Sequence, residues 1–257
     1  AWNDLNVEDS CRRILELCQV TPDVEGEEEA RAWLGFGALH RGCAAEARLH
    51  AEAGLAAAER LRDRHRLINM LTLHASLHMF QGDWAGAREF IGRALLVDPR
   101  EIRVLQIASY LEHITGQWEA GLALLDAVVE LMKRDPDQPL SNSAGGFILA
   151  MPTLLGGHGE YLDLAEAAAR RVLPKQGIER NFRRYALFTL GLTAAWSGDA
   201  QGAAEVYDAF EGFQAYLWPG YANGIQRGVA RVAALAGRVD EAMGYLEAGI
   251  DFLRRAN

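Results

Sequence analysis

The stretch that decides the fold is residues 68–99, which read INMLTLHASLHMFQGDWAGAREFIGRALLVDP. Good helix formers such as Leu, Ala, Met, Glu and Arg dominate on both sides of a central Gly-Asp. Gly82 suits the end of a first helix, because glycine takes the left-handed backbone conformation without steric cost. Pro99 suits the end of a second helix, because proline donates no backbone hydrogen bond and restricts the residue before it. The stretch therefore predicts two helices joined by a tight turn.

The same spacing recurs along the chain. Gly116-Gln117-Trp118 follows Gly82-Asp83-Trp84 after one period of 34 residues, and weaker copies lie on both sides. Small residues such as Ala75 and Ala87 sit where neighbouring helices must approach to roughly 8–10 Å. The predicted turn glycines are Gly42, Gly82, Gly116, Gly159, Gly198 and Gly237. Periodic units of this length predict a stack of helical hairpins in which each hairpin packs on its neighbours.

Composition narrows the class of protein. Half of the 257 residues are hydrophobic and there are seven prolines, which is typical of a folded helical chain without a membrane-spanning run of about 18 apolar residues. The net charge of -9 disfavours direct binding of nucleic acid, whose phosphates it would repel. Three cysteines without metal-ligand spacing predict a reducing, cytoplasmic environment. We expect Cys11 and Cys18, seven residues apart, on one buried helix face.

We expect a single repeat domain over residues 1–257, with residues 1–22 as an N-terminal capping helix or partial repeat. The chain starts at Ala1 and ends within a helical pattern, so we expect it to be part of a longer protein. Three connections are expected to be irregular, although none has the length or polarity of a domain linker. These connections are Asp135–Ala144, Pro174–Asn181 and Gln214–Tyr221.

The periodic pattern resembles the tetratricopeptide repeat, and the resemblance covers about Glu27 to Phe252. This resemblance implies an all-α fold, namely a right-handed superhelix, or α-solenoid, of about six helix-turn-helix repeats. It also implies that the first helix of each hairpin contributes side chains to a concave groove that binds a ligand.

A second resemblance is carried by the sequences GDWAGA at Gly82–Ala87, GDAQGAAEVY at Gly198–Tyr207 and GRVDEA at Gly237–Ala242. They resemble the C-terminal helical-repeat region of two groups of bacterial signalling proteins. One group is the LuxR-type transcription regulators with an NTPase core, and the other is the class III adenylate or guanylate cyclases with an NTPase-like module. The resemblance implies repeats that sense an inducer or partner and restrain an output domain, with no catalytic segment in this chain.

Candidate catalytic and metal residues are few. His74 and His78 share one helix face, but no third ligand accompanies them, so packing is the favoured interpretation. Cys43 lies near His40 without a recognisable base-orienting group or oxyanion hole, which favours a structural cysteine. The sequence therefore predicts a protein that is not an enzyme, with no catalytic residue, no metal and no cofactor.

The groove implied by the tetratricopeptide resemblance gives the candidate binding residues. Aromatic residues and arginine dominate binding hot spots, and arginine pairs bidentately with carboxylates. The mapped residues are Phe36, His40, Thr72, Ser76, Phe80, Arg103, Gln106, Tyr110, His113, Tyr185, Phe188, Trp196, Arg227 and Arg231. They predict a protein or peptide partner with acidic groups, or a small anionic effector. The alternative is that the same side chains only fill the core, as apolar residues at helical spacing usually do.

Two functions follow from these observations. The first is a regulatory arm of a bacterial signalling or transcription-regulating protein, which binds a ligand in the groove and passes a change of curvature to an attached domain. The alternative is a free-standing scaffold or adaptor that assembles protein complexes without sensing a ligand. Exposed ends of a repeat stack also leave open a homodimer through the C-terminal repeat. No membrane contact and no direct nucleic-acid contact are expected.

Overall fold

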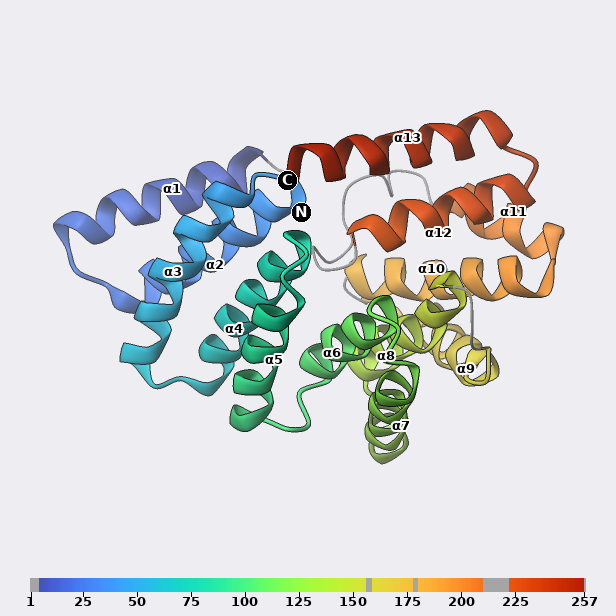
Figure 1. Ribbon diagram of the computed structural model, residues 1–257, viewed down its shortest axis with the longest axis horizontal. Helices are drawn as coiled ribbons and strands as arrows, with labels where there is room; N and C mark the ends of the chain where they lie inside the picture. Colours follow the sequence, from blue (N-terminus) through green and yellow to red (C-terminus); the bar gives the residue numbers. More distant parts are fainter. Residues whose placement is uncertain (1–4, 156–158, 178–179, 210–221, 257) are drawn as a thin grey trace. The chain divides into compact units, whose positions relative to one another are not determined.

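The computed structural model describes residues 5–155, 159–177, 180–209 and 222–256, and within these ranges it contains helices and their connections but no strand (Figure 1). This confirms the predicted all-α helical-repeat fold. The helices are α1 (Leu5–Val20), α2 (Val24–His40), α3 (Ala44–Leu61), α4 (Arg64–Phe80), α5 (Trp84–Val97), α6 (Ile102–Ile114), α7 (Trp118–Arg134), α8 (Pro139–Ala150), a 3-10 helix η1 (Met151–Leu155), α9 (Leu162–Val172), α10 (Arg180–Ser197), α11 (Ala200–Ala209), α12 (Ala222–Leu235) and α13 (Val239–Ala256).

The described residues fall into two compact units. Unit 1 contains the chain up to Ile107 together with the residues from Phe252 onward, and unit 2 contains the residues between Ala108 and Asp251. Among the described helices, none is both long enough and apolar enough to cross a membrane.

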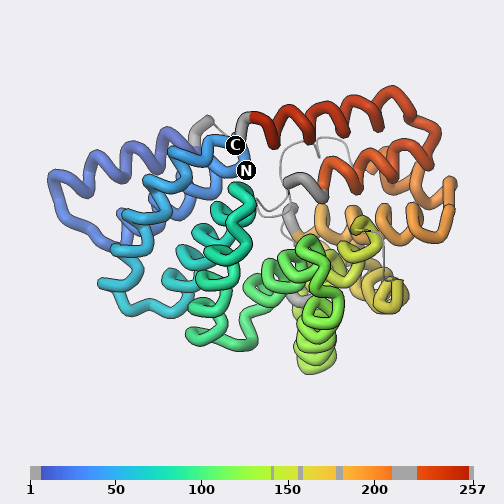
Figure 2. The backbone as a smooth tube through the Cα atoms, in the orientation of Figure 1, coloured from blue at the N-terminus to red at the C-terminus, as the bar shows by residue number. Residues whose placement is uncertain are grey.

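Successive helices pair as hairpins after α1, and the tube in Figure 2 shows the two helices of such pairs running side by side in opposite directions. The pairs are α2–α3, α4–α5, α6–α7, α8–α9, α10–α11 and α12–α13. Most of them turn at a glycine in the left-handed conformation, with φ between 71° and 79° at Gly42, Gly82, Gly116, Gly198 and Gly237. These are five of the six predicted turn glycines.

Each of these turns ends its first helix by the same hydrogen bond. At Gly82, the following Asp83 N–H donates to the carbonyl of His78, five residues earlier, at 2.9 Å. The equivalent bonds are Cys43 to Ala38, Gln117 to Glu112, Asp199 to Ala194 and Arg238 to Ala233. This pattern is a Schellman cap, which satisfies carbonyls that the helix end would leave unpaired.

In two hairpins the residue after the turn glycine also begins the second helix. The Asp83 carboxylate accepts a hydrogen bond from the Gly86 N–H at 3.0 Å, and the Asp199 carboxylate accepts one from the Gly202 N–H at 2.9 Å. Both are N-caps, which satisfy a free amide at the start of α5 and α11. The Gly-Asp pair therefore ends one helix and starts the next within two residues.

The core of unit 1 lies among α2, α3 and α4. Phe36 and Leu39 of α2 are buried with Leu73 and Leu77 of α4. A Cβ at Gly35 would lie 2.5 Å from the Leu73 Cδ2 atom, so the Leu73 side chain of α4 packs directly on the backbone of α2 at Gly35. Helix α3 contributes alanines to the cluster, namely Ala47, Ala51 and Ala58. Small residues thus permit the close packing that the repeat pattern predicted.

The core of unit 2 is built on α8, α9, α10 and α12. The ring centroid of Phe147 lies 5.5 Å from that of Phe188 and 5.1 Å from that of Tyr185. Gly228 of α12 faces the Phe188 ring, which would collide with a larger residue there. Helix α9 packs by Ala169 and Val172 against Ala186 and its neighbours. Aromatic side chains of the first helices therefore hold the hairpins of this unit together.

Side-chain hydrogen bonds join neighbouring hairpins at separations close to one repeat. Arg103 donates to Asn69, 34 residues earlier, at 2.7 Å. The Tyr161 hydroxyl donates to the carboxylate of Asp126, 35 residues earlier, at 2.7 Å. Burial and this hydrogen bond raise the pKa of Tyr161 to about 12. Tyr207 donates to Glu241 at 2.6 Å over 34 residues, and its pKa is raised for the same reasons.

Some local predictions were wrong. Asp135–Ala144 was expected to be an irregular connection, but α8 begins at Pro139, because proline is tolerated at the first position of a helix. Cys11 is buried as expected, whereas Cys18 is only partly covered and donates to the Asp23 carbonyl at 3.4 Å. The connection predicted at Gln214–Tyr221 lies outside the described residues.

The turn geometry gives a testable prediction. Gly82→Ala should lower the free energy of unfolding by about 1–2 kcal/mol, because an L-residue at φ 71° meets steric repulsion. Gly92→Ala is the matched control, since Gly92 lies within α5 with nothing within 4 Å of an added Cβ. This control should instead raise stability by about 0.5–1 kcal/mol. Urea denaturation followed by circular dichroism measures both, and equal effects of the two substitutions would contradict the assignment.

Candidate functional site

The predicted groove residues of α2 and α4 lie mostly in the interior of unit 1. Phe36, Thr72 and Ser76 are buried, and the Thr72 hydroxyl donates to the Asn69 carbonyl at 2.8 Å. Phe80 is partly exposed, with its ring centroid 5.5 Å from that of Phe252. His40 is largely covered, and burial with the nearby charge of Arg41 lowers its pKa to about 4. In this region the candidate residues mainly pack.

The predicted residues of α6 are similarly engaged. Arg103 donates to Glu101 and Asn69 at 2.8 and 2.7 Å, so its guanidinium is held within the protein. Gln106, Tyr110 and His113 are buried. The Nδ1 atom of His113 lies 2.6 Å from the Ser109 carbonyl oxygen, and the His113 ring packs edge-on against Trp118. None of these positions presents an accessible polar group of the kind that the groove hypothesis requires.

The predicted residues of unit 2 include accessible ones. Phe188 is buried, Tyr185 is partly exposed, and Trp196 is 45% exposed, beside Gly159. Arg227 and Arg231 lie one turn apart on α12, and both are exposed.

The packing brings the arginines near the aromatic cluster. Gly228, next to Arg227, faces Phe188, and the Arg231 guanidinium donates to the Thr153 carbonyl at 2.9 Å. In the part of the chain that the structure describes, neither arginine forms an ion pair. Unit 2 therefore carries two exposed arginines on the helix that packs, through Gly228, against the aromatic cluster. The guanidinium groups of these arginines could bind a carboxylate or another anion by donating hydrogen bonds to it.

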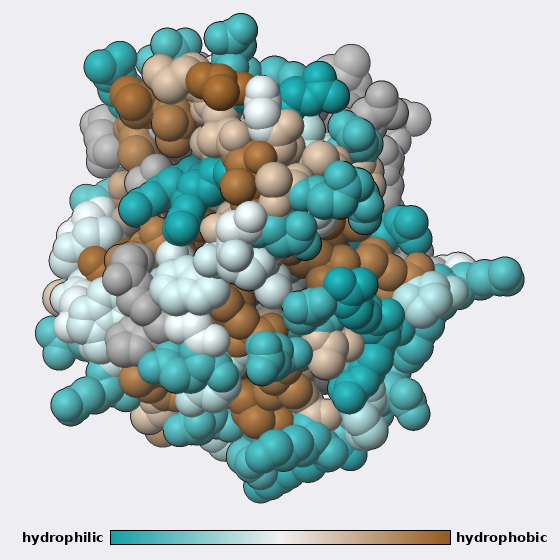
Figure 3. Space-filling model, turned by 90° about the vertical axis from the view of Figure 1, so that its right-hand side faces the viewer, coloured by the Kyte–Doolittle hydropathy of each residue, from teal (hydrophilic) through white to brown (hydrophobic). Residues whose placement is uncertain are grey.

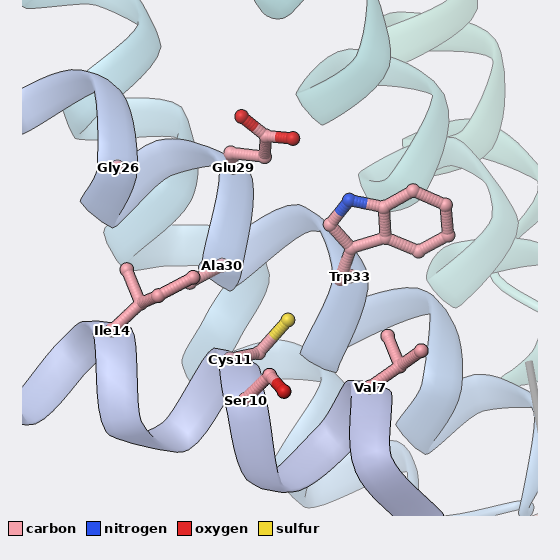
Figure 4. Close-up of a pocket in the computed structure, with 8 residues that line it drawn as sticks. All are labelled: Val7, Ser10, Cys11, Ile14, Gly26, Glu29, Ala30 and Trp33. Atoms are coloured by element: carbon pink, nitrogen blue, oxygen red, sulfur yellow. The ribbon is translucent and has the colours of Figure 1, made fainter. Parts of the chain in front are cut away.

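A cleft of about 370 Å³, which the sequence patterns did not predict, lies between α1 and α2 in unit 1 (Figure 4). Its lining comes from one stripe on each helix, with the spacing i, i+3, i+4 and i+7 on both. The residues are Val7, Ser10, Cys11 and Ile14 on α1, and Gly26, Glu29, Ala30 and Trp33 on α2. The small side chains of Ser10, Gly26 and Ala30 leave space that larger residues would fill. Matching stripes on consecutive helices are the sequence signal that could have revealed it.

Of the carboxylates near this cleft, Glu29 has the weakest ion pair. Arg66 of α4 lies 2.6 Å from the buried Glu28 and 2.7 Å from Glu25, but 4.0 Å from Glu29. Burial raises the pKa of Glu28, while the hydrogen bond to that carboxylate raises the pKa of Arg66. Arg66 is thus engaged chiefly by two other carboxylates, and Glu29 at the cleft keeps a 61% exposed side chain.

The histidine pair of α4 stacks on an aromatic ring. The ring centroids of His74 and His78 lie 4.5 and 5.1 Å from that of Phe90 on α5. His78 Nδ1 also lies 2.8 Å from the carboxylate of Asp83, the N-cap of α5. Burial lowers the pKa of His74. The two histidines therefore join the helices of one hairpin, and no group of metal-binding side chains occurs among the described residues.

Helix α13 carries an exposed apolar stripe. Its members are Val239, Met243, Leu246 and Ile250, each between 40% and 61% exposed. The adjacent face of the helix is covered, since Ala242 packs with Ala230 and Ala233 of α12. Figure 3 shows the side of the molecule that includes α11 and the start of α13, where hydrophobic residues lie between hydrophilic ones.

Comparison with known proteins assigns no family to the chain. No protein family model matches the chain, and no curated protein matches it. A tetratricopeptide repeat protein from Parabacteroides merdae is 15% identical, over 88% of this chain and 79% of its own, with a TM-score of 0.41. PilW, a widely conserved type IV pilus biogenesis factor, is 16% identical; the match covers 89% of this chain and 96% of the PilW chain, with a TM-score of 0.47. The assignment of the fold rests on the helical hairpins themselves.

The buried His40 predicts a pH dependence of stability. Its folded pKa of about 4 lies below the ordinary 6.5, so the folded state favours the neutral ring. The neutral His40 ring therefore contributes about 3 kcal/mol to the free energy of unfolding. This contribution should be complete above pH 6.5 and be lost as pH falls toward 4. We expect His40→Gln to flatten the decline in unfolding free energy between pH 7 and pH 4.5, measured by urea titration. An identical slope in the wild type and the variant would contradict this prediction.

Proposed function

We propose that this chain is a non-catalytic interaction module whose unit 2 binds acidic groups of a protein or peptide partner. The observation that carries the proposal is the pair of exposed arginines on α12, Arg227 and Arg231, in a chain of net charge -9. Most cations of unit 1 described above are held by carboxylates, as Arg41 is by Glu8 and Glu46 at 2.8 Å each. Among the described residues neither arginine of α12 pairs with a carboxylate, and Arg231, which donates to the Thr153 carbonyl, keeps further N–H donors, so both guanidinium groups suit recognition of a carboxylate.

The surroundings support an extended ligand. Tyr185 of α10 is partly exposed, and α10 packs against α12 where Phe188 meets Gly228, so an aromatic side chain is accessible on the helix next to the two arginines. Aromatic and arginine side chains together are typical of hot spots for peptide recognition. The ligand class is therefore an acidic or carboxylate-terminated peptide segment, and a small anionic effector shares the same chemistry.

We place this module in a bacterial cytoplasmic signalling protein, as its regulatory arm. Support comes from the Gly-Asp sequences that resemble the repeat regions of LuxR-type regulators and class III cyclases. Each hairpin contacts its neighbours, so a ligand that binds one arrangement of the hairpins better would favour that arrangement. A scaffold that binds its partner without sensing a ligand is the alternative, and it would use the same surface without a change of arrangement.

A charge-reversal experiment tests the binding surface. Fluorescein-labelled hexaglutamate with a free carboxyl terminus is the probe, and its binding is followed by fluorescence anisotropy. Arg227→Glu with Arg231→Glu should weaken binding at least about tenfold, which corresponds to about 1.4 kcal/mol.

The control for that experiment is Arg100→Glu with Arg134→Glu, which makes the same change in net charge at two other exposed arginines. This control should retain most of the binding. Equal losses in both double variants would show that the probe responds to net charge alone and would reject the site on α12.

The exposed stripe of α13 supports association into a homodimer. Pairing of two copies through this stripe would cover four apolar side chains that are 40% to 61% exposed in one copy. We expect concentration-dependent dimers in sedimentation velocity, abolished by Leu246→Glu. Leu96→Glu, at an 87% exposed position on α5, is the control and should not change the association. A monomer at all concentrations would reject this dimer.

A further inference from the structure

The cleft between α1 and α2 has a chemistry opposite to that of the α12 surface. We propose that it binds the side chain of a lysine or arginine presented by an extended segment of another protein. The cleft lies in unit 1, and its charged group is the carboxylate of Glu29. This site is therefore separate from the acidic-peptide site and does not depend on it.

The carboxylate is available for a ligand. Glu29 has a 61% exposed side chain, and its distance to the nearest cation in the described chain, Arg66, is 4.0 Å. That arginine already donates to Glu28 and to Glu25 at 2.6 and 2.7 Å. A cation entering the cleft therefore meets a carboxylate whose charge is only weakly compensated.

The arginines of α1 do not offset this charge. Arg12 forms ion pairs with Glu8 and Glu46, and Arg13 pairs with Glu16 at 2.5 Å. None of these residues lines the cleft.

An aromatic wall faces the same space. Trp33 lines the cleft one turn beyond Glu29 on α2, and its side chain is partly exposed. Figure 4 shows the nitrogen-bearing edge of the indole ring on the side of Glu29. An ammonium or guanidinium group near a tryptophan ring gains a cation–π attraction, which is strongest for tryptophan among the aromatic residues. A carboxylate and an indole on one wall therefore favour a cation over a neutral group.

The floor of the cleft suits the methylene stem of such a side chain. Val7, Cys11 and Ile14 point from α1 toward α2 (Figure 4). Burial, together with the charges of Glu29 and Glu8, raises the pKa of the Cys11 thiol, so the floor is uncharged at neutral pH. Lysine and arginine bury their aliphatic stems on apolar surface and keep the charged end at a polar rim.

The surface beyond the cleft favours a protein segment over a free amine. The volume of about 370 Å³ is near the lower end of the roughly 300–1,000 Å³ typical of pockets for whole small molecules. Leu17 lies one turn beyond the cleft residue Ile14 on α1 and is 52% exposed, and Val20 is 83% exposed. Apolar residues beside the bound cation in a peptide would contact this continuation of the stripe.

A matched pair of peptides tests the proposal. The probe is acetyl-Ala-Leu-Lys-Leu-Ala-amide, and in its control norleucine replaces lysine, which keeps the stem and removes the ammonium group. Binding is followed through the indole N–H resonance of Trp33, identified by its loss in Trp33→Phe. We expect the lysine peptide to bind about tenfold more tightly than the norleucine peptide. Equal binding of the two would overturn the proposal, because the site would then recognise only apolar surface.

Protein variants provide the second comparison. Glu29→Gln should weaken binding of the lysine peptide about tenfold, whereas Glu16→Gln, an exposed glutamate of α1 outside the cleft, should not. Equal losses in the two variants would overturn the assignment of Glu29. Thermal unfolding of both variants verifies that the fold is kept.

Two further measurements complete the test. Butylammonium should bind more weakly than the peptide, and binding as tight as that of the peptide would overturn the choice of a protein segment as ligand. Arg227→Glu with Arg231→Glu should leave lysine-peptide binding unchanged. This result would keep the proposal intact even if the acidic-peptide site failed its own test.

Discussion

The structure depends on a turn that few residues can make. At Gly82 and its equivalents the backbone adopts a positive φ, and the next amide closes the preceding helix by bonding five residues back. Only a residue without a Cβ adopts this conformation at no steric cost. Since the turn reverses the chain within a few residues, it sets which faces of two successive helices meet. The Gly-Asp order then begins the second helix directly, so the hairpin is determined locally before any contact with its neighbours forms.

Packing between hairpins follows from side-chain size. Glycine and alanine occur where helices approach, as at Gly35 against Leu73, and large residues fill the remaining space. This arrangement covers most of the inward faces of the first helices in unit 1. Binding chemistry is consequently left to side chains at positions where the covering helix does not reach, such as Arg227 in unit 2 and Trp33 in the cleft. The two proposed sites differ in charge, so one chain could hold an acidic and a basic segment at once.

Much of the fold could be predicted because its signals are local. Turn glycines, capping residues and Pro99 act within a few residues of their own positions, and the helix boundaries follow them closely. The exposure of the candidate site residues was harder to predict, since a pattern of residue types does not show how far neighbouring helices cover a side chain, as at the buried Thr72 and Gln106. The cleft depends on the sizes of residues on two helices jointly. A single helical pattern, such as that of Val7 to Ile14, does not contain this information.

The hydrogen bonds that join the hairpins link residues such as Arg103 and Asn69, about one repeat apart in the sequence. Closing such loops costs little entropy, because the cost rises only slowly with loop length and these loops are short. Chains rich in local contacts fold faster than chains of similar stability that depend on distant pairings. During synthesis, each completed hairpin could therefore pack on the one just released by the ribosome. The emerging chain would thus expose little more than one unfinished repeat to aggregation at any moment.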